Sequence, residues 1–421
     1  MQSKIKEKKQ PIFTKADKKR RKVIIPNLYP EFSVINQTIG KKLGYNLVIV
    51  PAANEEAVEL GKKYVHNDIC FPAQLNTGEL LLALKNSTED RDKLAVALSK
   101  KCNACRALQY FVLVRKALDE SGFEDIPIAT NGTDLEDVHP GFKLGIRYNI
   151  YALQAMLYLD ALYDMRQRII PYELKKGETE EVFKDYLTKG MKAFEKGLSP
   201  MLNVLKEAVV AFNKIPHDRN VKKPVVGIVG EILVNYHPTA NYNLVNYLLE
   251  NGMEPWLPPI LDFFRQEVVN MEEAAKHKFN TYPLVDRISS YLLGILFNYY
   301  IRKVEKIRKD FIYFSPKPDI RELSHNVEGI MEQAFNSGEG WLLPGEIIAM
   351  IKKGVKSFVI VQPFGCLPNH ISGRGMIKAI KEKFQNIQIL SLDYDPDISV
   401  GNIENRLQML IMTARELVKE S

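Results

Sequence analysis

The chain has 421 residues, of which 46% are hydrophobic and 26% charged, a composition typical of a globular protein with more than one domain. No apolar run reaches the roughly 18 residues of a membrane span, so we expect no transmembrane segment. The formal net charge is +7, and about that excess falls within the first 22 residues, which leaves the remainder near neutral. We therefore predict no nucleic-acid partner.

Residues 1–22 are predicted to form a basic, disordered tail, because they hold ten basic and two acidic residues. A peripheral contact of this tail with an acidic partner or an anionic membrane surface is the alternative. No apolar segment follows these charges, as a secretory signal would require, so we expect a cytoplasmic location. In that compartment grouped cysteines more often bind metal or perform redox chemistry than form stable disulfides.

Residues 23–140 are predicted to form a first α/β domain. Runs of β-branched residues predict strands, and segments with apolar residues at helical spacing alternate with them. The expected strands cover residues 22–27, 46–50, 95–98 and 126–130, and the expected helices cover residues 32–43, 55–64, 76–85 and 108–121. This alternation predicts a parallel sheet, whose ligands usually bind beyond the carboxyl ends of its strands.

The sequence pattern changes in residues 141–221, which contain long segments rich in Leu, Ala, Met, Lys and Glu. This pattern predicts a helical layer. Residues 222–421 are predicted to form a second α/β domain with a helical insert. Its expected strands cover residues 225–230, 357–361 and 387–392, and its expected helices lie within residues 242–250, 261–310, 330–354, 373–384 and 402–419. The predicted fold class is thus α/β, with two Rossmann-like parallel-sheet domains and helical insertions.

Four cysteines are the only thiols of the chain: Cys70, Cys102 and Cys105 in the first predicted domain, and Cys366 in the second. A thioredoxin-like pair at Cys102 and Cys105 would leave the other two unexplained. Structural zinc sites usually combine two close pairs, whereas the intervals here hold 31, 2 and 260 residues. Iron–sulfur clusters accept scattered cysteines, often beside proline. We favour a cluster in the cleft between the domains; zinc, thiol redox chemistry and unligated cysteines remain open.

The candidate catalytic groups are polar residues that follow a predicted strand or lie near a cysteine. Glu231 and His237 follow a predicted strand, where residues that line a cleft gather. His370 lies four residues after Cys366 and could donate a proton to a substrate oxygen. Asn369 and His370 could equally cap the helix that follows.

Four segments resemble the 2-hydroxyacyl-CoA dehydratase superfamily, most of all the branch fused to, or encoded beside, the acyl-CoA dehydratase activases. They are DICFP at 68–72, GE and NYHPTAN within 230–241, QPFGCLPNH at 362–370 and DYD at 393–395. The resemblance implies a cytoplasmic [4Fe–4S] protein that receives electrons from a separate, ATP-hydrolysing activase with its own iron–sulfur cluster. It also implies single-electron reduction or dehydration of a small substrate, with an acyl-CoA as one candidate.

Three further residues are candidates for cofactor binding. Asp68 and Arg106 lie close to cysteines, although bracing of the loops by hydrogen bonds is their simpler role. Arg374 precedes a predicted helix and could bind a phosphate of coenzyme A, although an ordinary helix start explains the same residues. Asp393 and Asp395 resemble a carboxylate pair, with a loop cap as the simpler interpretation.

The chain departs from typical dehydratases, which pair two related subunits, and this favours a reductase of an unidentified acceptor. It contains no phosphate loop and no dinucleotide fingerprint, so we expect the driving energy to come from the activase. Two other functions stay open. One is a non-catalytic metal-binding or scaffold subunit that holds zinc or an iron–sulfur cluster, and the other is a reductase of a lipid ester whose basic tail contacts the membrane.

Overall fold

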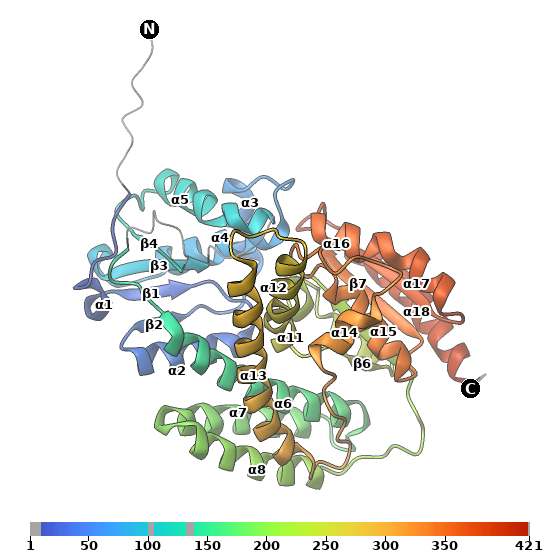
Figure 1. Cartoon of the computed structure of the whole chain (residues 1–421). Coiled ribbons are helices and arrows are strands. Elements are labelled where there is room, and N and C mark those ends of the chain that lie inside the picture. Colours follow the sequence, from blue (N-terminus) through green and yellow to red (C-terminus); the bar gives the residue numbers. More distant parts are fainter. Residues whose placement is uncertain (1–9, 100–104, 132–138, 420–421) are drawn as a thin grey trace. The chain divides into compact units, whose positions relative to one another are not determined.

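The computed structural model of the chain describes residues 10–99, 105–131 and 139–419 (Figure 1). Its described strands form two four-stranded parallel sheets, so the chain is an α/β protein as predicted. The described residues divide into two compact units. The first comprises residues 10–69, 73–99, 106–131 and 139–148, and the second comprises residues 70–72, Cys105 and 149–419. The segments at Cys70 and Cys105 therefore belong to the second unit, although the chain on either side of them folds in the first.

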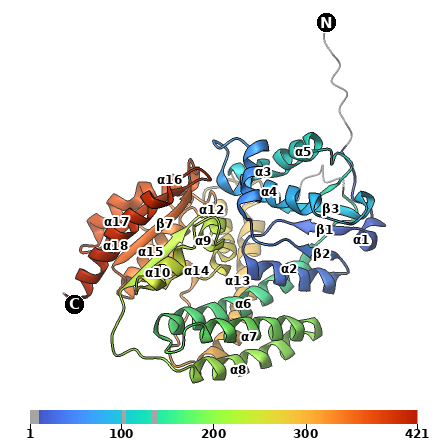
Figure 2. The same ribbon diagram turned by 180° about the vertical axis from the view of Figure 1, so that it is seen from behind.

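The sheet of the first unit has the strand order β2-β1-β3-β4. Its strands are β1 (Lys22–Ile25), β2 (Asn46–Ile49), β3 (Leu94–Ser99) and β4 (Ile128–Asn131). The helices along this part of the chain are α1 (Asp17–Arg20), α2 (Pro30–Leu43), α3 (Glu55–Tyr64), α4 (Phe71–Lys85) and α5 (Tyr110–Glu120). In Figures 1 and 2, α2 lies on one face of this sheet, and α3, α4 and α5 lie on the other. All four predicted strands are confirmed.

The sheet of the second unit has the strand order β6-β5-β7-β8. Its strands are β5 (Val225–Gly230), β6 (Glu254–Trp256), β7 (Ser357–Pro363) and β8 (Gln388–Tyr394). Side chains of β5 and β7 share one core cluster with α15 (Leu342–Lys352) and α17 (Ile377–Lys383), so these two helices cover one face of the sheet. The apolar run of β7 is buried along its whole length, as expected for an inner parallel strand.

The two sheets share one topology, in which the chain crosses from the first strand to the second on one side and to the third on the other. Such a reversal of strand order is the place where parallel α/β sheets usually bind ligands, just beyond the carboxyl ends of the two central strands. In the first unit β3 leads toward Cys105, and in the second unit β7 leads into Cys366. Both cysteine segments thus follow the third strand of a sheet.

The second unit contains further helices. They are α6 (Gly145–Ile169), whose first residues belong to the first unit, α7 (Glu178–Lys196), α8 (Leu198–Lys214), α9 (Ile232–Tyr236), α10 (Leu244–Glu250), α11 (Leu261–Arg265), α12 (Glu267–Lys276), α13 (Pro283–Arg308), α14 (Ile320–Asn326), α16 (Leu367–Ser372) and α18 (Val400–Lys419). Helices α6, α7 and α8 lie together away from its strands (Figures 1 and 2). Helices α7 and α8 pack side by side (Figure 2), as the predicted helical layer requires.

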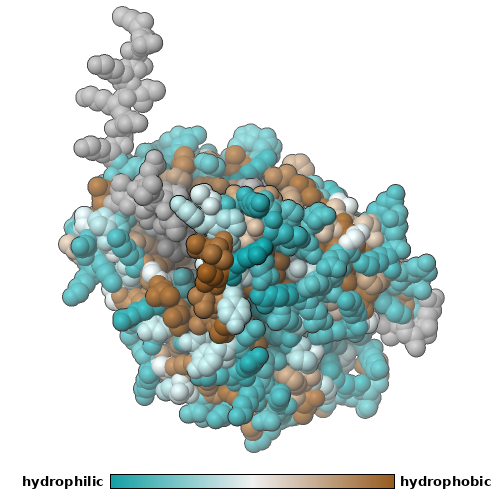
Figure 3. Space-filling view, viewed as in Figure 1, coloured by the Kyte–Doolittle hydropathy of each residue, from teal (hydrophilic) through white to brown (hydrophobic). Residues whose placement is uncertain are grey.

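Helix α13 carries exposed apolar side chains along its first half. Leu284, Tyr291 and Leu292 are each more than half exposed, and apolar atoms gather over this part of the helix in Figure 3. None of the described helices combines the length and apolar character needed to cross a bilayer.

Three details differ from the sequence-based predictions. Helix α4 begins at Phe71 rather than at residue 76, because Pro72 is well suited to the first turn of a helix. Two helices were predicted within residues 330–354, with a break at residues 338–340; only the second forms, as α15, and residues 330–341 form turns in which Gly338 and Gly340 adopt left-handed conformations. Residues 10–22 were expected in a disordered tail, but they contain α1 and place Phe13 in the core; residues 1–9 lie outside the described residues.

Candidate functional site

Cys366 is held in a tight turn at the carboxyl end of β7. Gly365, with a φ of 68°, reverses the chain directly before it. The backbone N–H of Cys366 donates to the carbonyl of Pro363 at 3.1 Å, and Pro368 lies in the first turn of α16. Cys366 is only 7% exposed, so its thiol lies below the surface.

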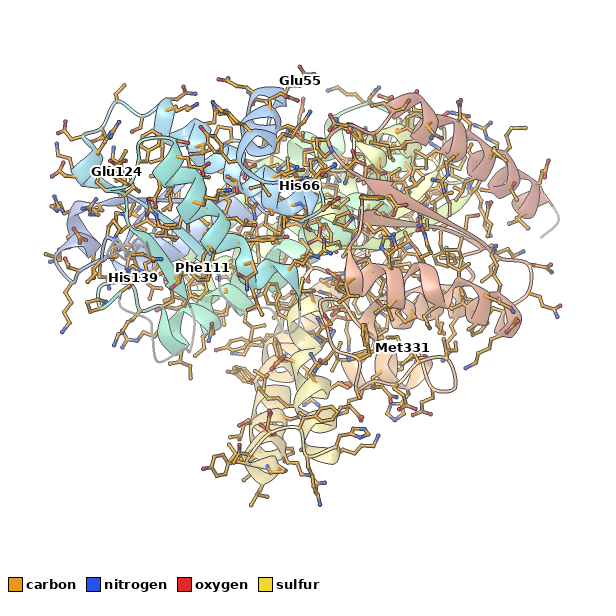
Figure 4. All side chains as sticks on the ribbon, turned by 90° about the horizontal axis from the view of Figure 1, so that it is seen from above. Glu55, His66, Phe111, Glu124, His139 and Met331 are labelled. Atoms are coloured by element: carbon orange, nitrogen blue, oxygen red, sulfur yellow. The ribbon has the colours of Figure 1, made fainter. Side chains whose placement is uncertain are left out.

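Arg106 links the chain next to Cys105 with the chain before Cys70. Cys70 is buried and directly precedes α4, after a turn that follows His66, which is labelled in Figure 4. Arg106 donates through Nη1 to the carbonyl oxygens of Asp68 and Ile69, the second at 3.0 Å. This pairing ties the residue after Cys105 to the residues before Cys70.

The three described cysteines share one electrostatic environment within the second unit. Cys70, Cys105 and Cys366 are all free thiols. Burial raises the pKa of Cys366, and the nearby groups of Glu339 and Cys70 raise it further. The predicted ligand Cys102 lies outside the described residues. In residues 10–99, 105–131 and 139–419, no group of three His, Cys, Asp or Glu side chains is arranged to hold a single metal ion.

Two carboxyl groups, Glu231 and Glu339, meet at the start of α9. Glu231 caps this helix by accepting a hydrogen bond from the N–H of Val234 at 2.8 Å, and Glu339 accepts one from the N–H of Ile232 at 3.0 Å. Burial raises the pKa of Glu231 to about 8, with the charge of Glu339 adding to the rise. Burial likewise raises the pKa of Glu339 to about 7, and Cys105 contributes to the increase. At neutral pH the pair therefore keeps a proton near the thiols.

Asn369 connects the carboxyl pair to Cys366. Its Nδ2 donates to Glu339 Oε2 at 2.7 Å and to Cys366 Sγ at 3.6 Å. The absence of a side chain at Gly230 lets the end of β5 approach the end of β7, because a Cβ atom there would lie 1.8 Å from the carbonyl oxygen of Val361. The ends of β5 and β7 thus pack against each other, with one polar network running from Glu339 through Asn369 to the sulfur.

A second network joins the predicted residues His370 and Arg374 to Asp393. His370 donates through Nδ1 to the carbonyl of Cys366 at 2.8 Å, which leaves its Nε2 3.8 Å from Asp393 Oδ1. Gln362 Nε2 donates to the same carboxylate at 2.6 Å, and Arg374 pairs with it as well. His370 therefore braces the Cys366 turn, and Arg374 already has a carboxylate partner.

The other candidates from the sequence lie in different settings. His237 is fully buried, and its Nδ1 accepts a hydrogen bond from the N–H of Ala240 at 3.3 Å. The side chain of Asp68 is 75% exposed and lies 3.5 Å from His66 Nδ1. Of the predicted catalytic residues, Glu231 has a pKa that the charge of Cys105 raises, and His370 contacts the backbone of Cys366.

Sequence reasoning missed Glu339, because a single glutamate between predicted helices gave no functional signal. The neighbouring glycines offered a clue, since Gly338 and Gly340 both have positive φ and turn the chain sharply on either side of it. A carboxylate between two such glycines is held in a tight turn rather than on a helix surface.

The side chains around Cys366 fit a cysteine-ligated iron–sulfur cluster. Hydrogen bonds to sulfur, such as the one from Asn369, tune the potential of a cluster, and a carboxyl pair that keeps a proton places less negative charge beside it than two carboxylates would. Cysteines around a single zinc ion lie within about 4 Å of one another, because each Zn–S bond is about 2.3 Å long. A cluster holds its cysteines farther apart, so the missing single-ion site in the described ranges does not conflict with this fit.

No protein-family model matches this chain, and a search of curated proteins found no match.

Proposed function

We propose that the chain is a cytoplasmic iron–sulfur protein in which Cys70, Cys102, Cys105 and Cys366 hold a [4Fe–4S] cluster. In this proposal an ATP-hydrolysing activase with its own cluster supplies low-potential electrons. The chain then reduces or dehydrates a small substrate, with an acyl-CoA as one candidate. A bound cluster would supply the single-electron transfer that amino-acid side chains do not perform.

The observation that carries the proposal is that the three described cysteines, Cys70, Cys105 and Cys366, belong to one unit. Residues 70–72 and Cys105 belong to the second unit with Cys366, although about 260 residues separate Cys105 from Cys366. The charge of Cys70 raises the pKa of Cys366. The charge of Cys105 raises the pKa of Glu231 and that of Glu339. Thiols from distant parts of a chain, of which the three described ones are free, favour a shared inorganic centre.

The side chains of this region have distinct roles in the proposal. Cys70 directly precedes the 15-residue helix α4, whose N-terminal N–H groups favour a thiolate. Asn369 donates to Cys366 Sγ and to Glu339 Oε2, which orients both groups. Glu231 or Glu339 holds the proton that must accompany an electron when a substrate oxygen is reduced or leaves as water.

The experiment that tests the proposal is anaerobic purification of the whole chain followed by iron, sulfide and zinc analysis. We expect brown protein with iron and sulfide in equal amounts, and a colour that bleaches with dithionite. Cys105→Ser should lose the cluster, while Cys366→Ser should retain an altered one. Colourless protein that contains one zinc ion would instead identify a structural metal site and the scaffold function.

Addition of the activase and ATP tests the redox step separately. We expect cluster reduction that requires both components, followed by reoxidation with a substrate such as a 2-hydroxyacyl-CoA. If reoxidation occurs only with a lipid ester, the lipid-ester function is correct. In that case, deletion of residues 1–9 tests whether the basic segment contacts the membrane.

A further inference from the structure

A cavity of about 80 Å³ lies in the second unit, and its lining contains neither the cysteines nor the Glu231–Glu339 pair. One face of α15 and the residue that follows it form one wall, with Glu346, Ala349, Met350 and Lys353 at helical spacing. The other walls come from α6, from the loop after β6 and from residues 315–318. A volume of this size holds roughly six water molecules, the scale of a small organic ligand.

Most charged groups that line the cavity are already paired with a group of opposite charge. Asp160 pairs with Lys317 at 3.0 Å, and Asp164 pairs with Arg308. The two other pairs are Asp262 with Arg265 at 2.6 Å and Arg168 with Glu254 at 3.6 Å.

Two lining groups differ from this pattern. In the part of the chain that the structure describes, Glu346 has no hydrogen-bond or ion-pair partner, although it is only 9% exposed. Among the described residues, Lys353 has no carboxylate partner; its Nζ donates to the hydroxyl of Ser315 at 3.1 Å and lies 5.5 Å from the centroid of the Trp256 ring. Burial raises the pKa of Glu346, and the charges of Asp262 and Glu339 raise it further. The cavity therefore has an unpaired acid in its interior and an unpaired base at its exposed rim.

The spacing of these two groups defines a complementary ligand. Glu346 and Lys353 lie seven residues apart on one helix face, about 10 Å along the axis, and the lysine side chain leans back toward the glutamate. The ammonium and carboxylate of an α-amino acid, with a charge-assisted hydrogen bond at each end, span about 8 Å. Ala349 and Met350 lie between the two charged groups and offer an apolar surface to a small side chain.

We propose that this cavity binds a small apolar α-amino acid, with its ammonium group on Glu346, its carboxylate on Lys353 and its side chain against Ala349, Met350 and Trp256. The site is distinct from the cysteines and does not depend on the proposed redox function. A purely structural Glu346 would be a buried carboxylic acid without any partner, which is costly, whereas an ammonium ligand satisfies it.

The test is calorimetric titration of the whole, anaerobically purified chain with L-alanine and L-valine. Isobutylamine, which is valine without its carboxylate, and isovalerate, which is valine without its amine, serve as matched probes. We expect both amino acids to bind and each single-charge probe to bind at least about tenfold more weakly, because a hydrogen bond to a charged group contributes about 1.5–3 kcal/mol.

Two variants locate the site. Glu346→Gln should weaken valine binding about tenfold and remove the advantage of valine over isovalerate. Lys353→Met changes an exposed residue at the rim, so the variant should fold. It should bind valine no more tightly than isobutylamine. Lys378→Met, a surface lysine of α17, is the control and should change neither value. The proposal is refuted if neither amino acid binds, if the single-charge probes bind as well as valine, or if Lys353→Met leaves valine affinity unchanged.

Discussion

Glu231→Gln is expected to change how the stability of the second unit depends on pH. In the unfolded chain this carboxyl has a pKa near 4.5, whereas in the folded protein burial and Glu339 raise its pKa to about 8. Between these two values the unfolded chain releases a proton that the folded chain retains. The free energy of unfolding therefore falls as pH rises through this window, and the contribution is fully present only below about pH 4.5.

The size of the effect follows from the shift. Each pH unit inside the window costs about 1.4 kcal/mol for one carboxyl, so Glu231 contributes a loss of up to about 3 kcal/mol between pH 5 and pH 7. Glutamine keeps a carbonyl oxygen that accepts from the N–H of Val234 but does not titrate. The stability of Glu231→Gln relative to the wild type should therefore rise by that amount over the same range.

The assay is urea unfolding followed by tryptophan fluorescence at several pH values. The chain has only two tryptophans, Trp256 and Trp341, and both lie in the second unit, so the signal reports that unit alone. Glu382→Gln, at an exposed position of α17, is the matched control and should show no pH-dependent difference. A constant difference between Glu231→Gln and the wild type from pH 5 to pH 8 would refute the reasoning.

Three other substitutions test the packing. Gly230→Ala should lower the free energy of unfolding by about 3 kcal/mol in the same assay, because φ is 156° and the new Cβ would lie 1.8 Å from the carbonyl oxygen of Val361. Gly252→Ala is the control: φ is 74° but no atom lies near the new Cβ, so the loss should be only about 1 kcal/mol. Asn369→Leu should cost about 2 kcal/mol by removing a donor from a buried carboxyl, and an unchanged midpoint would contradict that role. Phe13→Ala should cost about 3–5 kcal/mol and speed hydrogen exchange in β1, whereas unaltered exchange would show that Phe13 is not part of the core.

The sequence predicted the strands that are long, apolar and rich in β-branched residues. β7 and β5 are such strands, and their places were clear because β5 ends at Gly230 and β7 ends at Pro363. β6 was missed because it has only three residues, one of them Pro255, which suits an edge strand. Its position became visible only through its pairing with β5.

The candidate site was predictable where chemistry is local to a motif. The turns at Cys366 and Cys70 follow from nearby glycine and proline residues, although the helix after Cys70 begins five residues earlier than predicted. The partnership of Glu339 with Ile232 and Asn369 was not predictable, because it joins three segments that are distant in sequence. The full burial of His237 was not predictable, because a histidine that follows a strand can be either exposed or buried.

Iron and acid-labile sulfide in the anaerobically purified chain, measured beside four single Cys→Ser variants, test the central claim most directly. The account predicts four iron and four sulfide per chain, as a [4Fe–4S] cluster requires, and a loss of iron in the Cys105→Ser variant. Full iron content in all four variants, or wild-type protein that binds zinc and no sulfide, would contradict it.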